Sequence, residues 1–273
     1  MEINELKKTA QSIRINIVKM LAEAKSGHPG GSLSMADLLT VLYFDQMKID
    51  VKDPKWKDRD RLVLSKGHGA PGLYATLAQR GFFPQSELMS LRKCGAMLQG
   101  HPDMKNTPGV DMSTGSLGQG LSAANGMALA GKLDKADYRV YAIVGDGEIQ
   151  EGQFWEAAMS SAHYKLDNVT LFVDHNGLQI DGSNDEVMGV NPIPEKLRAF
   201  GWQVLEIDGH DYEQIQAAIV FAKKVQGRPV AIVAETVKGK GVSFMENQVG
   251  WHGKAPDAEQ CAQAVEELER GAK

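Results

Sequence analysis

The sequence predicts an α/β protein with a doubly wound, mainly parallel sheet and helices on both faces. Apolar runs of strand length recur along the chain, at 61–65, 140–144, 169–173, 203–207 and 230–235. Stretches with helical spacing lie between them, and strands that alternate with helices usually pair in parallel, buried on both faces. The 273 residues are 42% hydrophobic, so we expect one large domain spanning residues 1–273.

The first half of the chain supplies the first strand and several helices. Apolar residues recur at helical spacing from Leu6 to Ala24, and Gly27 follows as a stop signal. Residues 26–31 are expected to form a rigid glycine-rich loop, with Ser34 capping a second helix. After the strand at 61–65, two further helical patterns lie near 71–80 and 85–93.

A long loop from Gly95 to Gly115 precedes a probable helix that is rich in small residues, within the segment STGSLGQGLSAANGMALAGKL. Small residues let another backbone or a ligand approach closely. Helical patterns then recur in the second half of the chain, at 152–165 and 211–225, and an amphipathic helix is expected around Pro256 to Arg270.

Composition argues against several classes of function. The net charge is −5 with no block of like charges, so neither nucleic acid nor a membrane surface is an expected partner. Cys94 and Cys261 lie far apart and form no metal-binding spacing, which fits a reducing cytosol. The N-terminal segment has no apolar core of a signal peptide, so we expect a cytoplasmic protein.

Two glycine motifs resemble nucleotide-binding loops but lack the required context. The GQGLSA run at 118–123 follows no confident strand, unlike a dinucleotide fingerprint. The GxxxxGK match at 126–132 continues with Leu133 where Ser or Thr should bind Mg²⁺, and it falls inside a helical pattern. We therefore discount the first as a nucleotide-binding loop and interpret the second as helix packing.

The strongest functional signal lies just beyond two neighbouring strands. Asp146 follows the strand at 140–144, and Asn176 follows the strand at 169–173. In parallel sheets, ligands bind beyond the carboxyl ends of the strands. A carboxylate and a carboxamide there suit a hard cation such as Mg²⁺, which combines few protein ligands with phosphate oxygens. A Gly-Asp-Gly sequence alone is more often an ordinary turn, but Asn176 in the matching place favours a metal–diphosphate site.

This pair of motifs resembles the metal–diphosphate motif of thiamine diphosphate enzymes. The segments SGHPGGSLSMAD, LSKGHGAPGLYATLA, GHPD, STGSLGQGLSAANGMA, GDGEIQEGQFWEAA, HNGLQIDG and ETVKGKG narrow the resemblance to the transketolase family, in the family's order. The resemblance covers nearly the whole chain but only the amino-terminal half of an ordinary transketolase. It therefore implies the thiamine diphosphate-binding fold and the N-terminal subunit of a split transketolase. Lys66 stands where Asn is usual, and Ser116 where Pro is usual.

The resemblance also implies site residues. Asp146, Asn176 and the Leu178 carbonyl would bind Mg²⁺, with Ca²⁺ or Mn²⁺ as substitutes, and Asn176 also counts as a cofactor contact. The remaining implied contacts with thiamine diphosphate are Gly147 at the diphosphate, Gly115, Ser116 and Leu117 along the cofactor, Ile180 on the thiazolium ring, and Glu151 at a dimer interface near the cofactor.

Four glycine-flanked histidines match the family's active-site histidines: His28, His68, His101 and His252. A lone histidine is more often structural, but imidazole exchanges protons near neutral pH, and glycine loops hold these rings away from helical faces. The resemblance implies catalytic roles for all four and cofactor contacts for His68 and His252. The other three histidines match nothing in the family and keep a structural interpretation: His163, His175 and His210.

The implied reaction transfers a two-carbon ketol unit from a ketose phosphate to an aldose phosphate. In the family, a glutamate that activates the cofactor and the arginines that bind sugar phosphate lie on a second domain, which no segment of this chain resembles. We therefore expect a C-terminal partner subunit that carries them, in a heterotetramer with two copies of each subunit.

Three alternatives remain open from the sequence. One is another thiamine diphosphate-dependent carboligase, similar to 1-deoxyxylulose-5-phosphate synthase. Another is a transketolase for an unusual sugar. The last is a non-catalytic cofactor-binding module, against which the set of four histidines argues.

Overall fold

The computed structural model describes residues 1–271, which form one parallel sheet flanked by helices. The strand order is β1-β2-β3-β5-β4, and every neighbouring pair is parallel. The strands are β1 (Arg61–Leu64), β2 (Val140–Gly145), β3 (Val169–His175), β4 (Gln203–Asp208) and β5 (Val230–Glu235).

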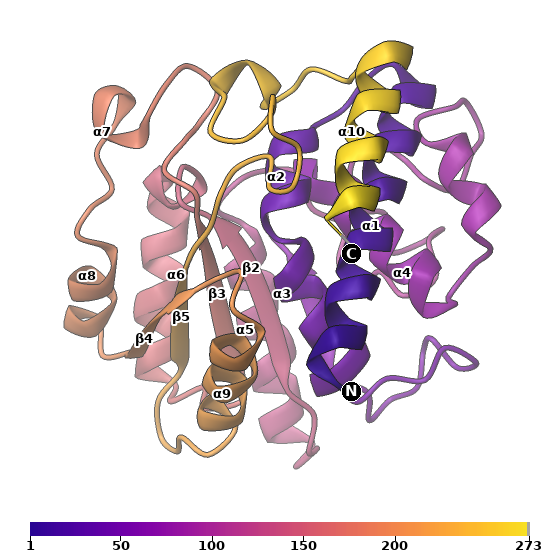
Figure 1. Cartoon of the computed structure of the whole chain (residues 1–273). Coiled ribbons are helices and arrows are strands. Elements are labelled where there is room, and N and C mark those ends of the chain that lie inside the picture. The colour runs from indigo at the N-terminus through magenta and orange to yellow at the C-terminus, as the bar shows by residue number, and fades with distance from the viewer. Residues whose placement is uncertain (272–273) are drawn as a thin grey trace.

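The α-helices cover both faces of this sheet, which confirms the predicted fold class (Figure 1). They are α1 (Ile3–Ala24), α2 (Pro29–Ser34), α3 (Ala36–Val41), α4 (Ala70–Arg80), α5 (Gly120–Leu133), α6 (Gly152–His163), α7 (Asn184–Val187), α8 (Ile193–Ala199), α9 (Tyr212–Ala222) and α10 (Ala258–Arg270). Shorter helical turns are η1 (Leu42–Gln46), a π-helix, and the 3₁₀ turns η2 (Gly67–Gly69), η3 (Gln85–Ser90), η4 (Glu148–Gln150) and η5 (Val249–Trp251).

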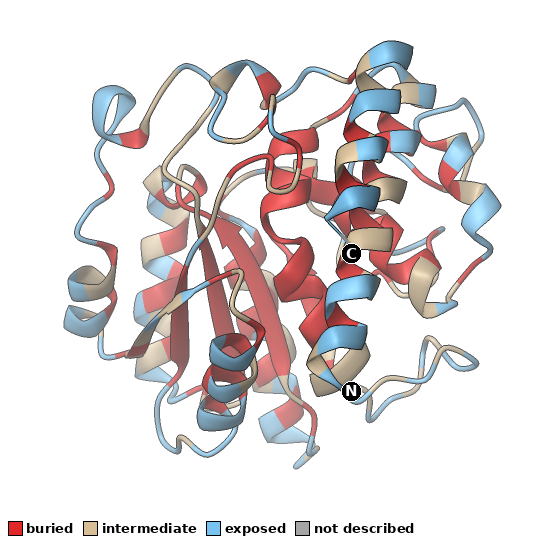
Figure 2. Cartoon of the chain, viewed as in Figure 1, coloured by how far each residue is buried: buried red, intermediate tan, exposed pale blue. Residues whose placement is uncertain are grey.

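Alternation along the strands divides the core into two layers. Tyr141 and Ile143 of β2 face the layer beneath α1, α3, α4 and α9, whereas Val140, Ala142 and Val144 face the layer beneath α5, α6 and α8. Successive strand side chains point to opposite faces, so a strand that is apolar throughout must be covered on both. In Figure 2, β1, β2, β3 and β5 are accordingly buried along nearly all of their length, whereas the edge strand β4 is mostly half-buried or exposed.

The first and last helices pack side by side, with α10 lying along α1 (Figure 1). The inward face of α1 is fully buried from Leu6 to Leu21, as its spacing predicts. Arg14 on this helix is also buried and forms a two-pronged ion pair with Asp37 of α3, at 2.9 and 2.6 Å. The interior on this side therefore holds a charged network as well as apolar packing.

The predicted loop at 26–31 and the predicted cap at Ser34 are both wrong. Pro29 begins α2, because its fixed φ and missing N–H suit the first turn of a helix. Ser34 is the last residue of that helix, and its hydroxyl donates to Asp174 instead of capping the next one.

One predicted helix is shorter in the structure, and two observed helices were not predicted. The pattern at 85–93 forms only the short turn η3, and neither α7 nor α8 was predicted. Ser183 and Glu186 form a capping box at the start of α7. A Ser followed three residues later by Glu is the sequence signal for such a helix start. Within residues 1–271, no helix combines the length and the apolarity needed to cross a membrane.

Candidate functional site

The two predicted metal-binding segments meet at the carboxyl edge of the sheet. Strands β2 and β3 are neighbours, with Gly145 in register with Asp174. The buried carboxylate of Asp146 accepts hydrogen bonds from the amide of Gly147, at 2.8 Å, and from that of Gly177, at 2.6 Å. Gly177 directly follows Asn176. The hydrogen bond from Gly177 therefore brings the backbone next to Asn176 into contact with Asp146.

The remaining predicted metal ligands converge on the same place. The carboxamide of Asn176 donates to Asp174 through Nδ2, at 3.0 Å, and accepts from the amide of Leu178 through Oδ1, at 3.2 Å. The carbonyl oxygen of Leu178 accepts from Lys238 Nζ at 2.9 Å. A carboxylate, a carboxamide and a carbonyl oxygen therefore lie just beyond the neighbouring ends of β2 and β3.

These groups fit a hard cation bound together with phosphate. Burial, and next the nearby carboxylate of Asp174, raise the pKa of Asp146, so a bound cation would relieve an unfavourable negative charge. Residues 1–271 hold no cluster of three or more His, Cys, Asp or Glu side chains placed for a metal. A cation here would therefore depend on one carboxylate, amide and carbonyl oxygens, and ligand oxygens, as Mg²⁺ does with phosphates.

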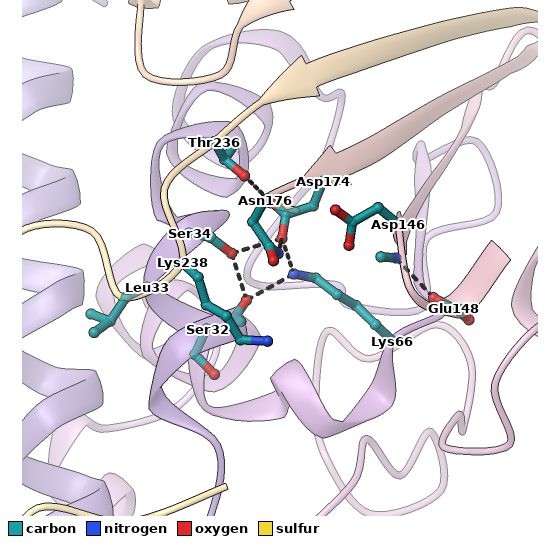
Figure 3. Close-up of polar contacts among 12 residues, drawn as sticks. Ser32, Leu33, Ser34, Lys66, Asp146, Glu148, Asp174, Asn176, Thr236 and Lys238 are labelled. Atoms are coloured by element: carbon teal, nitrogen blue, oxygen red, sulfur yellow. Dashed lines mark hydrogen bonds and ion pairs between the residues drawn. The ribbon is translucent and has the colours of Figure 1, made fainter. Parts of the chain in front are cut away.

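A buried ion pair lies directly behind this edge (Figure 3). Lys66, which is 1% exposed, donates to Asp174 at 2.5 Å and to the carbonyl oxygen of Gly31 at 2.8 Å. Burial alone would raise the pKa of Asp174, but the Lys66 charge and the surrounding donors together lower it. Asp174 is thus held as a carboxylate in the interior.

Lys238 is a site residue that the sequence interpretation missed. Its sequence context indicates only a short basic spot in a loop, yet it is 2% exposed and lies between Leu178 and His252, whose Nδ1 is 2.8 Å from its amine. Burial, and next the charge of Lys66, lower its pKa to about 8. Its position shortly after β5 was the available signal, because ligands bind beyond strand ends in such sheets.

Three of the four predicted catalytic histidines form one cluster. The ring centroids of His28 and His68 are 5.2 Å apart, those of His68 and His252 are 5.2 Å apart, and those of His28 and His252 are 5.6 Å apart. Burial is the main cause that lowers their pKa values, to about 4 for His28, 2 for His68 and 3 for His252. The three rings are therefore neutral near pH 7, and each offers one donor and one acceptor nitrogen.

The fourth histidine lies beside the predicted cofactor loop. His101 is exposed, and burial, with Arg92 as the next cause, lowers its pKa. Its ring lies only 3.0 Å from where a Cβ would project from Gly115, whose φ is +148°. A side chain at Gly115 would therefore strain the backbone and collide with the imidazole.

Glu148 holds this loop against the strand ends. Its buried carboxylate accepts from the amides of Gly118 and Gly145, each at 3.0 Å, and from the Ser65 hydroxyl. Burial is the main cause that raises its pKa. The carboxylate thereby ties β1, β2 and the loop that carries Ser116 and Leu117 into one unit.

The other predicted cofactor contacts lie on the segments next to these strand ends. Gly147 begins the turn after β2, Ser116 is exposed and Leu117 is half-buried. Glu151 is exposed and packs over Gly118, while the Ile180 side chain is 66% exposed. An exposed isoleucine beside a polar site is suited to cover an apolar ring.

Two of the unassigned histidines take structural partners. His175 Nδ1 lies 2.5 Å from the carboxylate of Glu235 at the neighbouring strand end. His210 Nδ1 lies 2.7 Å from Asp37, and its Nε2 accepts from the amide of Val237 at 2.9 Å. His210 therefore links the α1–α3 network to the loop that carries Lys238.

The family model described as "Transketolase, thiamine diphosphate binding domain" matches residues 5–270. The chain belongs to the transketolase family. This confirms the resemblance seen in the sequence, the transferase class of the enzyme and the expected binding of thiamine diphosphate by this domain.

Two of the curated transketolase relatives that are named as subunits illustrate matches that run almost end to end. The chain is 48% identical over 266 residues to the 6-deoxy-6-sulfo-D-fructose transketolase subunit SqwG of Clostridium sp., covering 97% of each. It is 42% identical over 268 residues to one of the named subunits of the apulose-4-phosphate transketolase of Phocaeicola vulgatus, covering 98% of this chain and 95% of that protein.

Longer transketolases match over less than half of their length. The transketolase of Rattus norvegicus is 42% identical over 268 residues, which cover 98% of this chain and 42% of that protein. The crystal structure of transketolase from Campylobacter jejuni superposes with a TM-score of 0.92 at 34% identity, covering 98% of this chain and 43% of that one.

Proposed function

We propose that this chain binds Mg²⁺ and the diphosphate of thiamine diphosphate, and that with a partner subunit it transfers a two-carbon ketol unit between sugar phosphates. The observation that carries the proposal is the convergence of Asp146, Asn176 and Leu178 beside three neutral histidines. Family membership supports the same function. When bound, thiamine diphosphate supplies the carbanion chemistry that breaks and forms the carbon–carbon bond.

The residues at the strand ends would anchor the cofactor. Asp146, Asn176 and the carbonyl of Leu178 would hold the cation, with Gly147 presenting its backbone to the diphosphate. Lys238 adds a positive charge beside the Leu178 carbonyl, which favours the same anionic group. Ser116 and the rest of its loop would lie along the cofactor, and Glu151 and Ile180 would border it.

The histidines would bind substrate hydroxyl groups and move protons. Because the rings of His28, His68 and His252 are neutral near pH 7, each can accept a hydrogen bond from a hydroxyl or donate one to a carbonyl oxygen. His28 Nδ1 is buried with no hydrogen-bond partner among residues 1–271, so the histidine cluster contains an unsatisfied ring nitrogen. His101, at the exposed side, would contact the incoming sugar.

A partner subunit would complete the site. The two relatives named as subunits are covered at 97% and 95% of their length, which supports a chain that works with a separate partner. We propose that the partner carries the activating glutamate and the sugar-phosphate-binding residues, in a cytoplasmic heterotetramer with two copies of each subunit.

The sugar substrate is the part of the proposal that this chain defines least. One relative is named for 6-deoxy-6-sulfo-D-fructose and another for apulose 4-phosphate, although both match this chain over nearly its whole length. The far end of the sugar would be bound by the partner. A transketolase for an unusual sugar is therefore kept as the second candidate.

A reconstitution assay tests the function. The chain is co-purified with its partner and assayed with thiamine diphosphate and Mg²⁺, using xylulose 5-phosphate, 6-deoxy-6-sulfofructose, apulose 4-phosphate and pyruvate as donors. Ketol transfer from one of the sugars to an aldose phosphate is expected only when both subunits are present. Turnover by this chain alone would contradict the need for a partner, and use of pyruvate would favour the 1-deoxyxylulose-5-phosphate synthase-like alternative.

A further inference from the structure

The carboxylate of Asp174 is the centre of the polar cluster behind the cation site (Figure 3). It is fully buried at the end of β3. Its Oδ2 accepts from Ser34 Oγ at 2.7 Å, Lys66 Nζ at 2.5 Å and Asn176 Nδ2 at 3.0 Å. Its Oδ1 accepts from Thr236 Oγ1 at 2.6 Å. Four side chains from separate segments thus donate to one carboxylate.

This arrangement allows only one orientation of the Asn176 carboxamide. An ionised carboxylate only accepts hydrogen bonds, so the group that faces Asp174 must be the NH₂ end. The carboxamide oxygen then faces the other way, where it already accepts from the amide of Leu178 at 3.2 Å. A flipped carboxamide would place its oxygen against a carboxylate oxygen of Asp174 and turn its NH₂ group toward the amide N–H of Leu178.

The hydrogen bonds of this cluster also use both carboxylate oxygens of Asp174. Both of them accept hydrogen bonds from protein donors, whereas Asp146 accepts only from the backbone amides of Gly147 and Gly177 within the described residues 1–271. The two neighbouring carboxylates therefore have different surroundings. Asp146 faces the predicted cation, and Asp174 is enclosed by donors.

We propose that Asp174 is a positioning residue: it holds the Asn176 carboxamide with its oxygen turned toward the cation, and Lys66 holds Asp174 in place. The proposal rests on the cation site described under Proposed function. A purely structural role for Asp174 would tie segments together without affecting Asn176. The hydrogen bond from Asn176 Nδ2 to Asp174 distinguishes the two roles, because it is the contact between this cluster and a predicted cation ligand.

The Asn176 carboxamide can be observed directly by NMR in the ¹⁵N-labelled full-length chain without metal. Its side-chain signals are assigned by their loss in Asn176→Ala. In the wild type, we expect one Nδ2 proton to be shifted and protected from exchange with water. Signals that exchange like those of a free carboxamide would overturn the proposal, and this outcome needs no folded variant.

The main variant pair removes the carboxylate and its counter-charge together. In Lys66→Met/Asp174→Leu, no unpaired charge is buried, since replacing a buried ion pair by apolar residues is often tolerated. We expect the protected Asn176 signal to disappear while the backbone spectrum stays folded. Thr236→Val is the matched control: it removes a donor to the other oxygen of Asp174, so the Asn176 signal should stay. Persistence of the signal in the folded double variant would contradict the proposal.

Metal affinity provides a second readout. Mn²⁺ is titrated into the full chain with thiamine diphosphate and followed by electron paramagnetic resonance. The double variant should weaken Mn²⁺ binding by about 10-fold or more, the usual effect of losing a group that orients a ligand. Because one charge of each sign is removed, the net charge of the chain is unchanged.

The same double variant is then placed in an Asn176→Ala background. If Asp174 acts through Asn176, Mn²⁺ affinity should fall no further there. An equal loss in both backgrounds would show that Asp174 acts independently of Asn176 and would overturn the proposal. Failure of the wild-type chain to bind Mn²⁺ would instead contradict the cation site, while the NMR experiment would still decide the orientation of Asn176.

Discussion

Lys238 donates a hydrogen bond to the carbonyl oxygen of Leu178, 60 positions away in the sequence, with 2.9 Å between Nζ and the oxygen. The acceptor is one of the predicted cation ligands. A lysine amine and the predicted cation would therefore share the same edge of the sheet, and together they would face the negative charge of a diphosphate.

Replacing Lys238 by Gln should weaken thiamine diphosphate binding. Hydrogen bonds to charged groups contribute about 1.5–3 kcal/mol, which corresponds to about a 10- to 100-fold loss of affinity. Calorimetry with Mg²⁺ and the partner subunit measures the change. Lys240→Gln, two residues later in the same loop, is the matched control and should bind nearly normally. Equal losses for both variants would assign the effect to general surface charge.

Asp146→Ala should abolish Mg²⁺-dependent cofactor binding while the fold stays intact. Removing Asp146 relieves a charge buried close to a second carboxylate but also removes two hydrogen bonds from backbone amides, so the free energy of unfolding of the metal-free chain should change by no more than about 1–2 kcal/mol. Calorimetry with the partner present measures binding, and urea denaturation measures stability. Asp134→Ala, exposed at the end of α5, is the control. Normal cofactor affinity in Asp146→Ala would remove Asp146 from the site.

The neutral histidines predict how the stability of the free chain depends on pH. The pKa of His68 is lowered from 6.5 to about 2, and that of His28 from 6.5 to about 4. The unfolded chain therefore binds protons below pH 6.5 that the folded chain does not. Stability should be fully present above pH 6.5 and should fall as the pH drops toward 4.

Thermal unfolding measured from pH 8 to pH 4 tests this dependence on His68. The Tm should decrease below pH 6.5 in the wild type, and the decrease should be smaller in His68→Gln. His163→Gln is the control, since that residue lies outside the histidine cluster. The same pH dependence in His68→Gln and in the wild type would contradict the prediction.

Two glycines of α5 should respond in opposite ways to alanine. A Cβ on Gly120 would lie 2.4 Å from Ser65 Cβ, so Gly120→Ala should destabilise by about 1–3 kcal/mol. A Cβ on Gly126 would meet nothing within 4 Å, and Gly126→Ala should stabilise the helix by about 0.5–1 kcal/mol. Urea denaturation of the free chain compares them. Equal effects would mean that helix propensity, and not the contact with Ser65, determines the difference.

The strands and the chemistry at their ends were predictable because their signals are local. The five apolar runs became the five strands, nearly to the residue, since a buried parallel strand requires apolar side chains on both faces. The approach of Asp146 to Asn176 followed from the geometry of parallel sheets.

The contacts between distant segments were not predictable in the same way. Ser34 was expected to cap a helix, but it donates to Asp174, which is 140 positions away. Lys238 resembles an ordinary loop residue in the sequence, and only the position of β5 brings it beside Leu178. Short-range patterns carry no information about such partners, because the partner is determined by which strands become neighbours.

The strand order determines when this site can form during synthesis of the chain. Strand β4 pairs with β5, and β5 lies between β3 and β4, so the sheet stays incomplete until residues 230–235 have been made. The ribosome has by then already released Asp146 and Asn176, yet Thr236 and Lys238 emerge only afterwards. A nascent chain thus carries two of the predicted cation ligands well before Thr236 and Lys238, and the polar cluster at the strand ends can be completed only after β5 has been synthesised.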